Sequence, residues 1–397
     1  MLVALAALAA GPAPAASAQG RPDVSSAAAA IVVDGRNGEV MFAKRPDDRR
    51  PVASTTKLMT ALLALESARP REVFTAPAYD AMPAESRINL RAGERMTVQD
   101  LLEALLLESA NDAAAAIAEN LSGTRSAFVE EMNARAQELD LENTSYANPI
   151  GLDDPANYSS ARDLAALTRL LLERPRFARI VDMPVAELES GAVPRVIDNR
   201  NPLVASTPWV SGVKTGHTLG AGYVLVGSAE GRGDAKVISV VLGEPSEAAR
   251  DADTLELLTW GLKQFRPVRV LDSERALARS DIRYFDDRKA RLVPRRGAVL
   301  TVRKGERIRR RVRSREELEG PLPAGARAGL VTVLVNGEPV RRVALVTAAE
   351  VPEAGTLRVL TSALGVPLTF ALGLAILLAA PIAVLLLARG RRRRSAI

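Results

Sequence analysis

Residues 51–66 read PVASTTKLMTALLALE and place a serine and a lysine at the head of an otherwise apolar run. Ser54 and Lys57 are three positions apart, so a helix puts them on one face, one turn from each other. Only seven of the 53 lysine and arginine residues in the chain are lysine. The pattern therefore indicates that position 57 needs a property that arginine lacks.

The composition of the chain narrows its possible chemistry. Its 397 residues allow about two domains, and a hydrophobic content of 47% is enough for a real core. The sequence has no cysteine, which excludes thiolate nucleophiles, disulfides and zinc–thiolate sites. Its single histidine, His217, excludes a metal site with several histidine ligands and leaves one candidate for a Ser-His-Asp triad. We expect neither a metal nor a cofactor.

Both ends of the chain carry targeting patterns. Residues 1–18 are uncharged and end in Ala-Ser-Ala, which is typical of a secretory signal peptide, although the usual positive start is missing. Residues 366–388 also lack charge and would span about 35 Å as a helix, enough to cross a bilayer. Five arginines follow directly, and positive charge stays cytoplasmic. We expect residues 389–397 to be cytoplasmic and the body of the protein extracytoplasmic.

The region between these ends begins with an expected α+β domain at residues 19–267. Residues 29–33 and 39–43 read as strands, and residues 54–185 as mostly helical. Three more strands within residues 209–243 precede a helix at about residues 246–265. This order favours an antiparallel sheet covered by helices.

A small all-β domain is expected at residues 268–350, followed by a linker at 351–365. The domain shows short alternating strands and holds 20 basic against 11 acidic residues. Nucleic-acid binding is not expected, because the domain has only two aromatic residues, Tyr284 and Phe285, and lies outside the cytoplasm. We interpret the basic charge as a solvated face near anionic wall polymers or lipid.

Three short motifs carry the chemistry. A lone Ser-x-x-Lys is weak, with about 0.4 occurrences expected by chance. The second motif puts small polar groups where an apolar helix pattern should be packed, and the third ends a predicted strand. In chain order, the motifs are Ser54-x-x-Lys57, Ser109-x-Asn111 and Lys214-Thr215-Gly216. Together and in this order they are the signature of penicillin-binding proteins and serine β-lactamases.

The first motif has a direct chemical reading. A serine hydroxyl becomes a useful nucleophile when a neighbouring base takes its proton. Lysine can be that base only when it is neutral, which requires burial and a nearby positive charge. Arginine does not deprotonate in proteins, so Lys57 cannot be replaced by it. Lys214 would supply the second positive charge.

The other two motifs supply polar groups around the serine. Ser109 can relay a proton between Lys57 and a leaving group, and Asn111 can hold an amide of the substrate. Gly216 lets a substrate backbone approach as an added edge strand. Lys214 and Thr215 then offer a cation and a hydroxyl to a carboxylate.

With these motifs the chain resembles the D-alanyl-D-alanine carboxypeptidases of the low-molecular-mass penicillin-binding protein family (the penicillin-binding protein 5 type, serine peptidase family S11). The likeness covers about residues 28–350 and includes NPIGLDDPANYSSARDLAALTRLLL and DNRNPLV. It implies a β-lactamase/transpeptidase-like sheet covered by helices, a small C-terminal all-β domain and a C-terminal membrane tether, here a full transmembrane helix.

The resemblance also implies a role for each residue. Ser54 would be acylated by the stem pentapeptide of peptidoglycan at its penultimate D-alanine, and β-lactams would acylate the same serine. Lys57 would be the base, and Arg200, in DNRNPL, would help bind the terminal carboxylate beside Lys214 and Thr215. The backbone N–H groups of Ser54 and His217 would form the oxyanion hole.

Several alternatives can be weighed on the sequence. A class A β-lactamase would carry an E-x-x-L-N segment, which the sequence lacks. A Ser-His-Asp hydrolase would use His217 as its base, but the sequence has no G-x-S-x-G turn. A peptidoglycan DD-endopeptidase and a non-catalytic penicillin-binding wall scaffold remain open.

Overall fold

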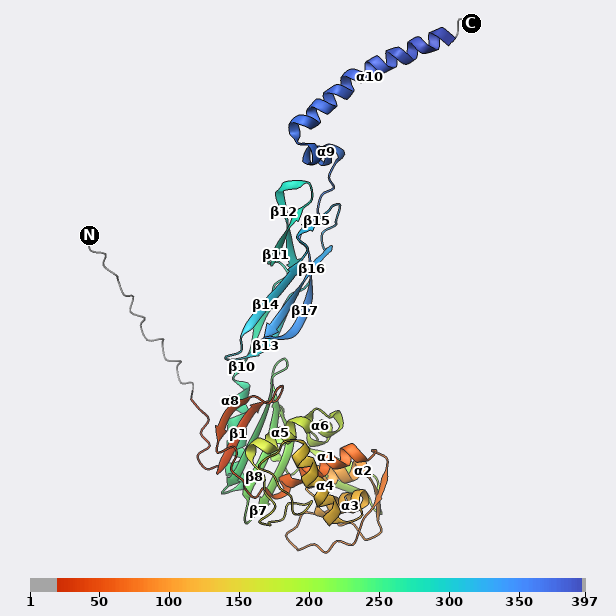
Figure 1. Ribbon diagram of the computed structural model, residues 1–397. Helices are drawn as coiled ribbons and strands as arrows, with labels where there is room; N and C mark the ends of the chain where they lie inside the picture. Colours follow the sequence, from red (N-terminus) through yellow and green to blue (C-terminus); the bar gives the residue numbers. More distant parts are fainter. Residues whose placement is uncertain (1–19, 395–397) are drawn as a thin grey trace, which may run out of the picture. The chain divides into compact units, whose positions relative to one another are not determined.

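The chain divides into two units after Phe265 in the computed structural model (Figure 1). The structure describes residues 20–394, with side chains up to residue 384. The predicted signal peptide, residues 1–18, lies outside the described residues, as do the last three residues of the predicted tail.

A five-stranded antiparallel sheet organises the N-terminal unit. The spatial order is β2-β1-β9-β8-β7, so β7 forms one edge. All residues of β1 are buried, which explains its continuous apolar run. The strands are β1 (Ala29–Asp34), β2 (Val40–Lys44), β7 (Val210–Thr218), β8 (Gly222–Glu230) and β9 (Lys236–Glu244). These five predicted strands are confirmed.

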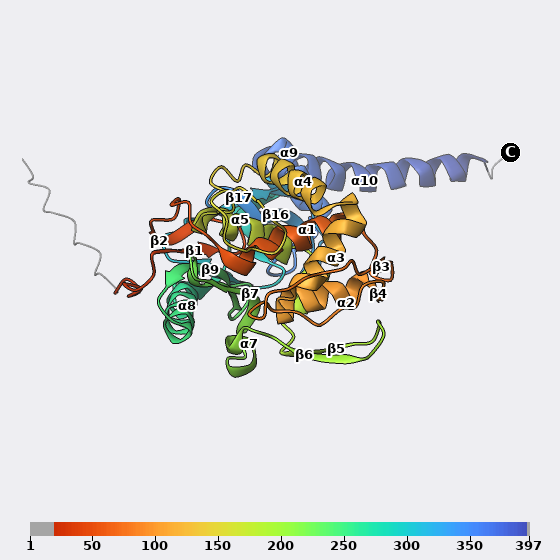
Figure 2. The same cartoon turned by 90° about the horizontal axis from the view of Figure 1, so that it is seen from below.

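Helices cover both faces of this sheet. Ile31 and Val33 of β1 point into the larger core, which is shared with the main helical block, whereas Ala30 and Val32 point to the opposite face. That second face is covered by α8 (Glu247–Leu262), which lies on its own side of the sheet in Figure 2. The strict alternation along β1 shows why both faces need apolar residues. The α+β prediction is confirmed.

The helical block fills the chain between β2 and β7. Helix α1 is buried over most of its length, and Thr97 caps α2 by accepting the Asp100 N–H, as its position before the apolar run predicts. The elements are a 3₁₀ turn η1 (Ala53–Thr56), α1 (Lys57–Ser67), α2 (Val98–Glu103), a π-helical turn η2 (Ala104–Glu108), α3 (Asn111–Ser122), α4 (Arg125–Glu138), α5 (Ala161–Leu172), α6 (Pro175–Val181) and α7 (Pro202–Ser206).

Two small hairpins in and beside this block were not predicted. They pair β3 (Val73–Thr75) with β4 (Arg95–Thr97), and β5 (Val185–Leu188) with β6 (Arg195–Asp198). Strands of three or four residues are too short to show a reliable periodicity. The expectation of a mostly helical segment was therefore incomplete here.

The C-terminal unit is built on a six-stranded sheet with the order β14-β16-β17-β12-β11-β15 and a separate β10-β13 pair. Its own core includes Leu292, Val331 and Leu345. The basic strand β14 is almost entirely exposed. The strands are β10 (Phe265–Leu271), β11 (Ala278–Ile282), β12 (Phe285–Pro294), β13 (Ala298–Arg303), β14 (Ile308–Ser314), β15 (Glu317–Leu318), β16 (Arg327–Val335) and β17 (Glu338–Thr347). The all-β prediction is confirmed.

Two helices end the described chain. The segment expected to be a linker contains α9 (Thr356–Leu364), and the Arg358 guanidinium lies 4.1 Å from the centre of the Phe285 ring. Helix α10 (Val366–Arg394) follows. Within it, Val366–Val384 is long and apolar enough to cross a membrane, judged by length and composition.

Candidate active site

The predicted serine and lysine meet at the start of α1. Ser54 lies in the turn η1 and Lys57 is the first residue of the helix. Lys57 Nζ donates one hydrogen bond to Ser54 Oγ at 2.8 Å and another to the carbonyl oxygen of Ile150 at 2.6 Å. The lysine has no exposed surface. The sequence spacing therefore brings a base into direct contact with a hydroxyl.

The surroundings of Lys57 favour its neutral form. Burial, and then the positive charge of Lys214, lower the pKa of Lys57 well below its ordinary value. The negative charges of Glu85 and Asp112 act in the opposite direction, to a smaller extent. A neutral lysine in this position can take the proton of the Ser54 hydroxyl.

The loop that carries Ile150 is packed against the serine turn. Asn148 Oδ1 accepts the N–H groups of Gly151 at 2.7 Å and Leu152 at 3.1 Å, which shapes the loop. Gly151 has φ of +90°, and a Cβ atom there would lie 2.0 Å from the carbonyl oxygen of Ala53. Only glycine fits this conformation and this contact.

The second motif occupies a break in a helix. The turn η2 widens the end of α2, and Ser109 then adopts a left-handed backbone conformation with φ of 64°. Helix α3 restarts at Asn111. Ser109 and Asn111 are both buried, at 6% and 5% exposure. The break explains how polar residues occur within an apolar helical pattern.

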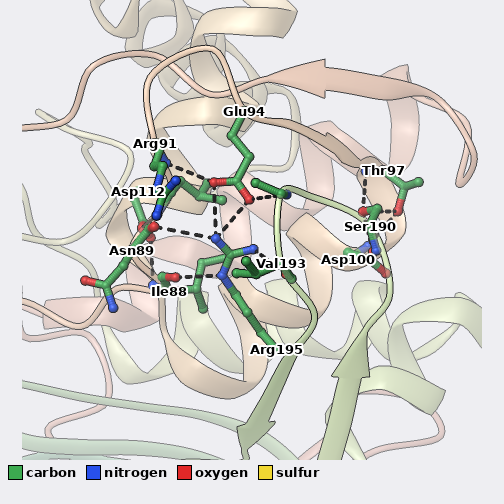
Figure 3. A network of polar contacts seen from close by, with 12 residues as sticks. Ile88, Asn89, Arg91, Glu94, Thr97, Asp100, Asp112, Ser190, Val193 and Arg195 are labelled. Atoms are coloured by element: carbon green, nitrogen blue, oxygen red, sulfur yellow. Dashed lines mark hydrogen bonds and ion pairs between the residues drawn. The ribbon is translucent and has the colours of Figure 1, made fainter.

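A polar network ties the loop between β3 and β4 to neighbouring elements (Figure 3). Asp112, the residue after the motif, accepts the N–H groups of Ile88 at 3.2 Å and Leu90 at 2.9 Å. Glu94 forms a buried ion pair with Arg195 of β6 at 2.9 Å. These contacts fix the second half of the loop between β3 and β4 against α3 and against β6.

The third motif lies on the edge strand β7, beside the serine turn. Lys214 is 1% exposed, and its Nζ donates to the carbonyl oxygen of Thr215 at 3.0 Å. A Cβ atom on Gly216 would lie 2.9 Å from the Ser54 nitrogen. The glycine is therefore needed for the packing of β7 against Ser54, besides the substrate approach expected from the sequence. Burial, and then the charges of Arg200 and Arg250, lower the pKa of Lys214 to about 7.

Arg200 precedes this strand in the chain and His217 lies within it, and the side chains of both are engaged by other groups. The guanidinium of Arg200 is about half exposed and forms an ion pair with Glu108, the residue before the second motif. The His217 ring stacks on Tyr223 of β8, with 4.0 Å between the ring centres. Among the described residues, Lys57 is the hydrogen-bond partner of the Ser54 hydroxyl.

Sequence reasoning missed four contributors to this site. Glu108 and Asp112 flank the second motif and could have been suspected from that position. Ile150 acts through a backbone carbonyl, which has no sequence signal. Glu85 lies in an irregular loop 26 positions before its partner Asn111. Within residues 20–394, no group of three or more His, Asp or Glu side chains is placed to hold a metal ion.

Residues 15–246 match the family model described as D-alanyl-D-alanine carboxypeptidase. The chain belongs to this family. It is 31% identical to the D-alanyl-D-alanine carboxypeptidase DacA of Haemophilus influenzae, over 82% of this chain and 85% of the relative. It is 28% identical to DacF of Bacillus subtilis, over 85% and 89% of the two chains. The family prediction is confirmed.

The fold comparison agrees with this family. The structure is similar to penicillin binding protein 5 from Haemophilus influenzae, with a TM-score of 0.59 and 29% identity over 83% of this chain and 98% of the other. It is also similar to penicillin binding protein 6B from Escherichia coli, with a TM-score of 0.60 and 27% identity over 83% and 98%. The likeness spans both units, and the expected fold class is confirmed.

We predict that Gly151→Ala destabilises the protein far more than Gly93→Ala. Both glycines have positive φ, +90° and +81°, so both variants carry the left-handed penalty of about 1–2 kcal/mol. A Cβ atom at position 93 meets nothing within 4 Å, whereas one at position 151 collides with the backbone of Ala53. Thermal unfolding of the two variants measures the difference, and equal losses would show that the loop does not need to lie against the serine turn.

Proposed function

We propose that this chain is a serine-type D-Ala-D-Ala carboxypeptidase that removes the terminal D-alanine from peptidoglycan stem pentapeptides through an acyl-enzyme on Ser54. The observation that carries the proposal is the 2.8 Å hydrogen bond between Lys57 Nζ and Ser54 Oγ. This contact joins a nucleophile to a lysine whose neutral form is favoured by burial. Membership of the family supplies the substrate class.

In this mechanism, Ser54 Oγ attacks the carbonyl carbon of the penultimate D-alanine while Lys57 takes the hydroxyl proton. The backbone N–H groups of Ser54 and His217 stabilise the developing oxyanion. The tetrahedral intermediate collapses, the peptide bond breaks, and the proton passes from Lys57 through Ser109 to the leaving amine. Water then attacks the ester while Lys57 takes one of its protons, and Lys57 returns that proton to Ser54 Oγ as the ester bond breaks. The stem tetrapeptide is released, with the Ser54 hydroxyl and the neutral Lys57 restored.

The substrate would bind along the edge strand β7. An edge strand offers unpaired backbone groups to an extended peptide, and β7 ends the sheet on this side. Lys214, Thr215 and Arg200 would hold the terminal carboxylate, and Asn111 a backbone amide of the stem. The carboxylate and strained amide of a β-lactam would occupy the same positions, so we propose that β-lactams acylate Ser54.

We propose the following organisation along the chain: a signal peptide at residues 1–18, the catalytic domain at 19–267, the β domain at 268–350, a connecting segment at 351–365, a transmembrane helix at 366–388 and a cytoplasmic tail at 389–397. The exposed apolar residues of α10, such as Phe370 and Leu377, support contact with lipid. The arginines after the helix favour a cytoplasmic C-terminus and an extracytoplasmic catalytic domain.

The function is tested by D-alanine release from diacetyl-Lys-D-Ala-D-Ala by the full chain in detergent. We expect Ser54→Ala to lower kcat/KM by about 10³-fold or more, because the acyl-enzyme cannot form. Lys57→Arg should cost about 10²–10⁴-fold, because arginine stays charged and cannot take the proton.

Labelling by a fluorescent penicillin completes this test. We expect wild-type protein to be labelled and Ser54→Ala to remain unlabelled. Labelling that persists in Ser54→Ala would contradict the assigned nucleophile. Protein that binds penicillin but releases no D-alanine would instead favour a DD-endopeptidase or a non-catalytic scaffold.

The pKa of Lys214 predicts a pH dependence of substrate affinity. Since this pKa is about 7, Lys214 loses its charge as the pH rises through 7, and the KM for a peptide with a terminal carboxylate should rise in the same range. A matched peptide with an amidated C-terminus is the control, and its KM should change little. A KM that stays constant between pH 6 and 8.5 for the free acid would exclude Lys214 as the carboxylate partner.

Membrane attachment is tested by fractionation of cells that express the chain. We expect the full chain to stay in the membrane pellet after an alkaline carbonate wash, because a spanning helix is not released by charge disruption. A chain that ends at residue 355 should appear in the soluble extracytoplasmic fraction. Release of the full chain by the wash would show that α10 does not span the bilayer.

A further inference from the structure

The loop between β3 and β4 contacts Asn111 of the second motif through the Glu85 carboxylate and through the backbone of Ser86. Glu85 Oε2 accepts a hydrogen bond from Asn111 Nδ2 at 2.6 Å, and Oε1 accepts the backbone N–H of Met82 at 3.0 Å. The hydroxyl of Tyr79 also donates to Glu85. The backbone N–H of Asn111 donates to the carbonyl oxygen of Ser86 at 2.8 Å. The side chain of Glu85 is thus held from three directions.

A carboxylate in this place determines how the Asn111 amide is turned. An ionised carboxylate only accepts hydrogen bonds, so the NH₂ group of Asn111, and not its oxygen, must face Glu85. The Nδ2 atom also lies within hydrogen-bond reach of the Tyr79 hydroxyl, so the Oδ1 atom is the part of the amide that remains for a substrate. A neutral amide at position 85 could donate or accept, and would therefore tolerate both orientations of Asn111.

Glu85 is a carboxylate at neutral pH. Burial alone would raise its pKa, but the hydrogen bonds from Tyr79, Asn111 and the Met82 N–H, together with the charge of Lys57, lower the pKa below its ordinary value. Its charge reaches the catalytic base as well. Lys57 is faced by Lys214 on β7, by Glu85 on the loop and by Asp112 on α3, and the two carboxylates oppose the lowering of its pKa.

The rest of the loop is fixed without Glu85. Asp112 binds the N–H groups of Ile88 and Leu90, and the buried ion pair of Glu94 and Arg195 anchors the end of the loop (Figure 3). Loss of the Glu85 contact would therefore release the Asn111 amide while the loop stays attached to the domain.

We propose that Glu85 is a positioning residue for the carboxypeptidase reaction, which holds the Asn111 amide in the single orientation that presents Oδ1 to the substrate. The inference rests on the proposed function. It adds a residue outside the three sequence motifs to the groups that the reaction needs.

The experiment compares three variants of the full chain in detergent. Glu85→Gln removes the charge at constant shape. Tyr79→Phe removes one partner of Glu85 and leaves its charge. Asp80→Asn is the matched control, because Asp80 is an exposed acid of the same loop. We measure kcat and KM for D-alanine release against pH, the rate of acylation by a fluorescent penicillin, and thermal unfolding.

We expect Glu85→Gln to lower kcat/KM on the pH plateau by about tenfold, because Asn111 loses its fixed orientation. The acid limb of the profile should also move to lower pH, because Lys57 loses a nearby negative charge and its pKa falls. Tyr79→Phe should lower kcat/KM less and leave the acid limb in place. Asp80→Asn should match wild type in both readouts. A loss of loop structure alone would not produce this combination.

A double-mutant cycle with Asn111→Ala provides the decisive comparison, with the acylation rate as readout because it stays measurable in slow variants. If Glu85 acts through Asn111, Glu85→Gln should have almost no further effect on the plateau rate in the Asn111→Ala background. If the effects of Glu85→Gln and Asn111→Ala on the acylation rate multiply, or if Glu85→Gln is as active as wild type, the inference about Glu85 is wrong. The proposed function would be unaffected by either result. Wild-type protein that neither releases D-alanine nor reacts with penicillin would overturn the proposed function instead.

Discussion

A lysine with no exposed surface lies 2.8 Å from a serine hydroxyl, and the Ile150 carbonyl and the close packing of Gly151 and Gly216 hold the two residues in place. Burial of an ammonium group is costly unless the group loses its proton or finds full compensation. Here burial, and then the second cation, Lys214, favour the neutral amine of Lys57, while Glu85 and Asp112 limit that shift of its pKa. Helix α1 must therefore lie inside the core rather than on the surface. Burial of α1 therefore serves the packing of the core and also keeps Lys57 in its neutral form.

Sheet topology brings the three motifs together from distant parts of the chain. The order β2-β1-β9-β8-β7 places β7 at the edge of the sheet. One edge of β7 pairs with β8, its backbone at Gly216 packs on the serine turn, and its outer edge pairs with no other strand of this sheet. The helical block contributes the second motif, Ser109 and Asn111, at the break between α2 and α3. Each motif thus arises from a different kind of element: a helix start, a helix break and an edge strand. Their convergence depends on the whole domain and not on any local segment.

The sequence was sufficient for the parts of this arrangement that have a local signal. Strands β7, β8 and β9, the cap at Thr97 and the three motifs could all be recognised from periodicity and spacing. The hairpins β3–β4 and β5–β6 could not, because their strands are too short, and α9 was expected to be a linker. Glu85, Glu108 and Ile150 depend on contacts across 26, 92 and 93 positions, respectively. Such contacts exist only once the fold is complete, and Ile150 contributes a carbonyl that any residue would offer.

The π-helical turn η2 limits how residues Ala104–Glu108 can vary. Such a turn accommodates one residue more than an α-helical turn, and here it leads directly into the left-handed backbone conformation of Ser109. Deletion of a single residue from Ala104–Glu108 would let a regular helix continue toward Asn111 and would remove the break in which Ser109 lies. The apolar residues of this turn are buried, so exchanges between residues of similar volume are compatible with the packing, whereas a change in the length of the segment is not.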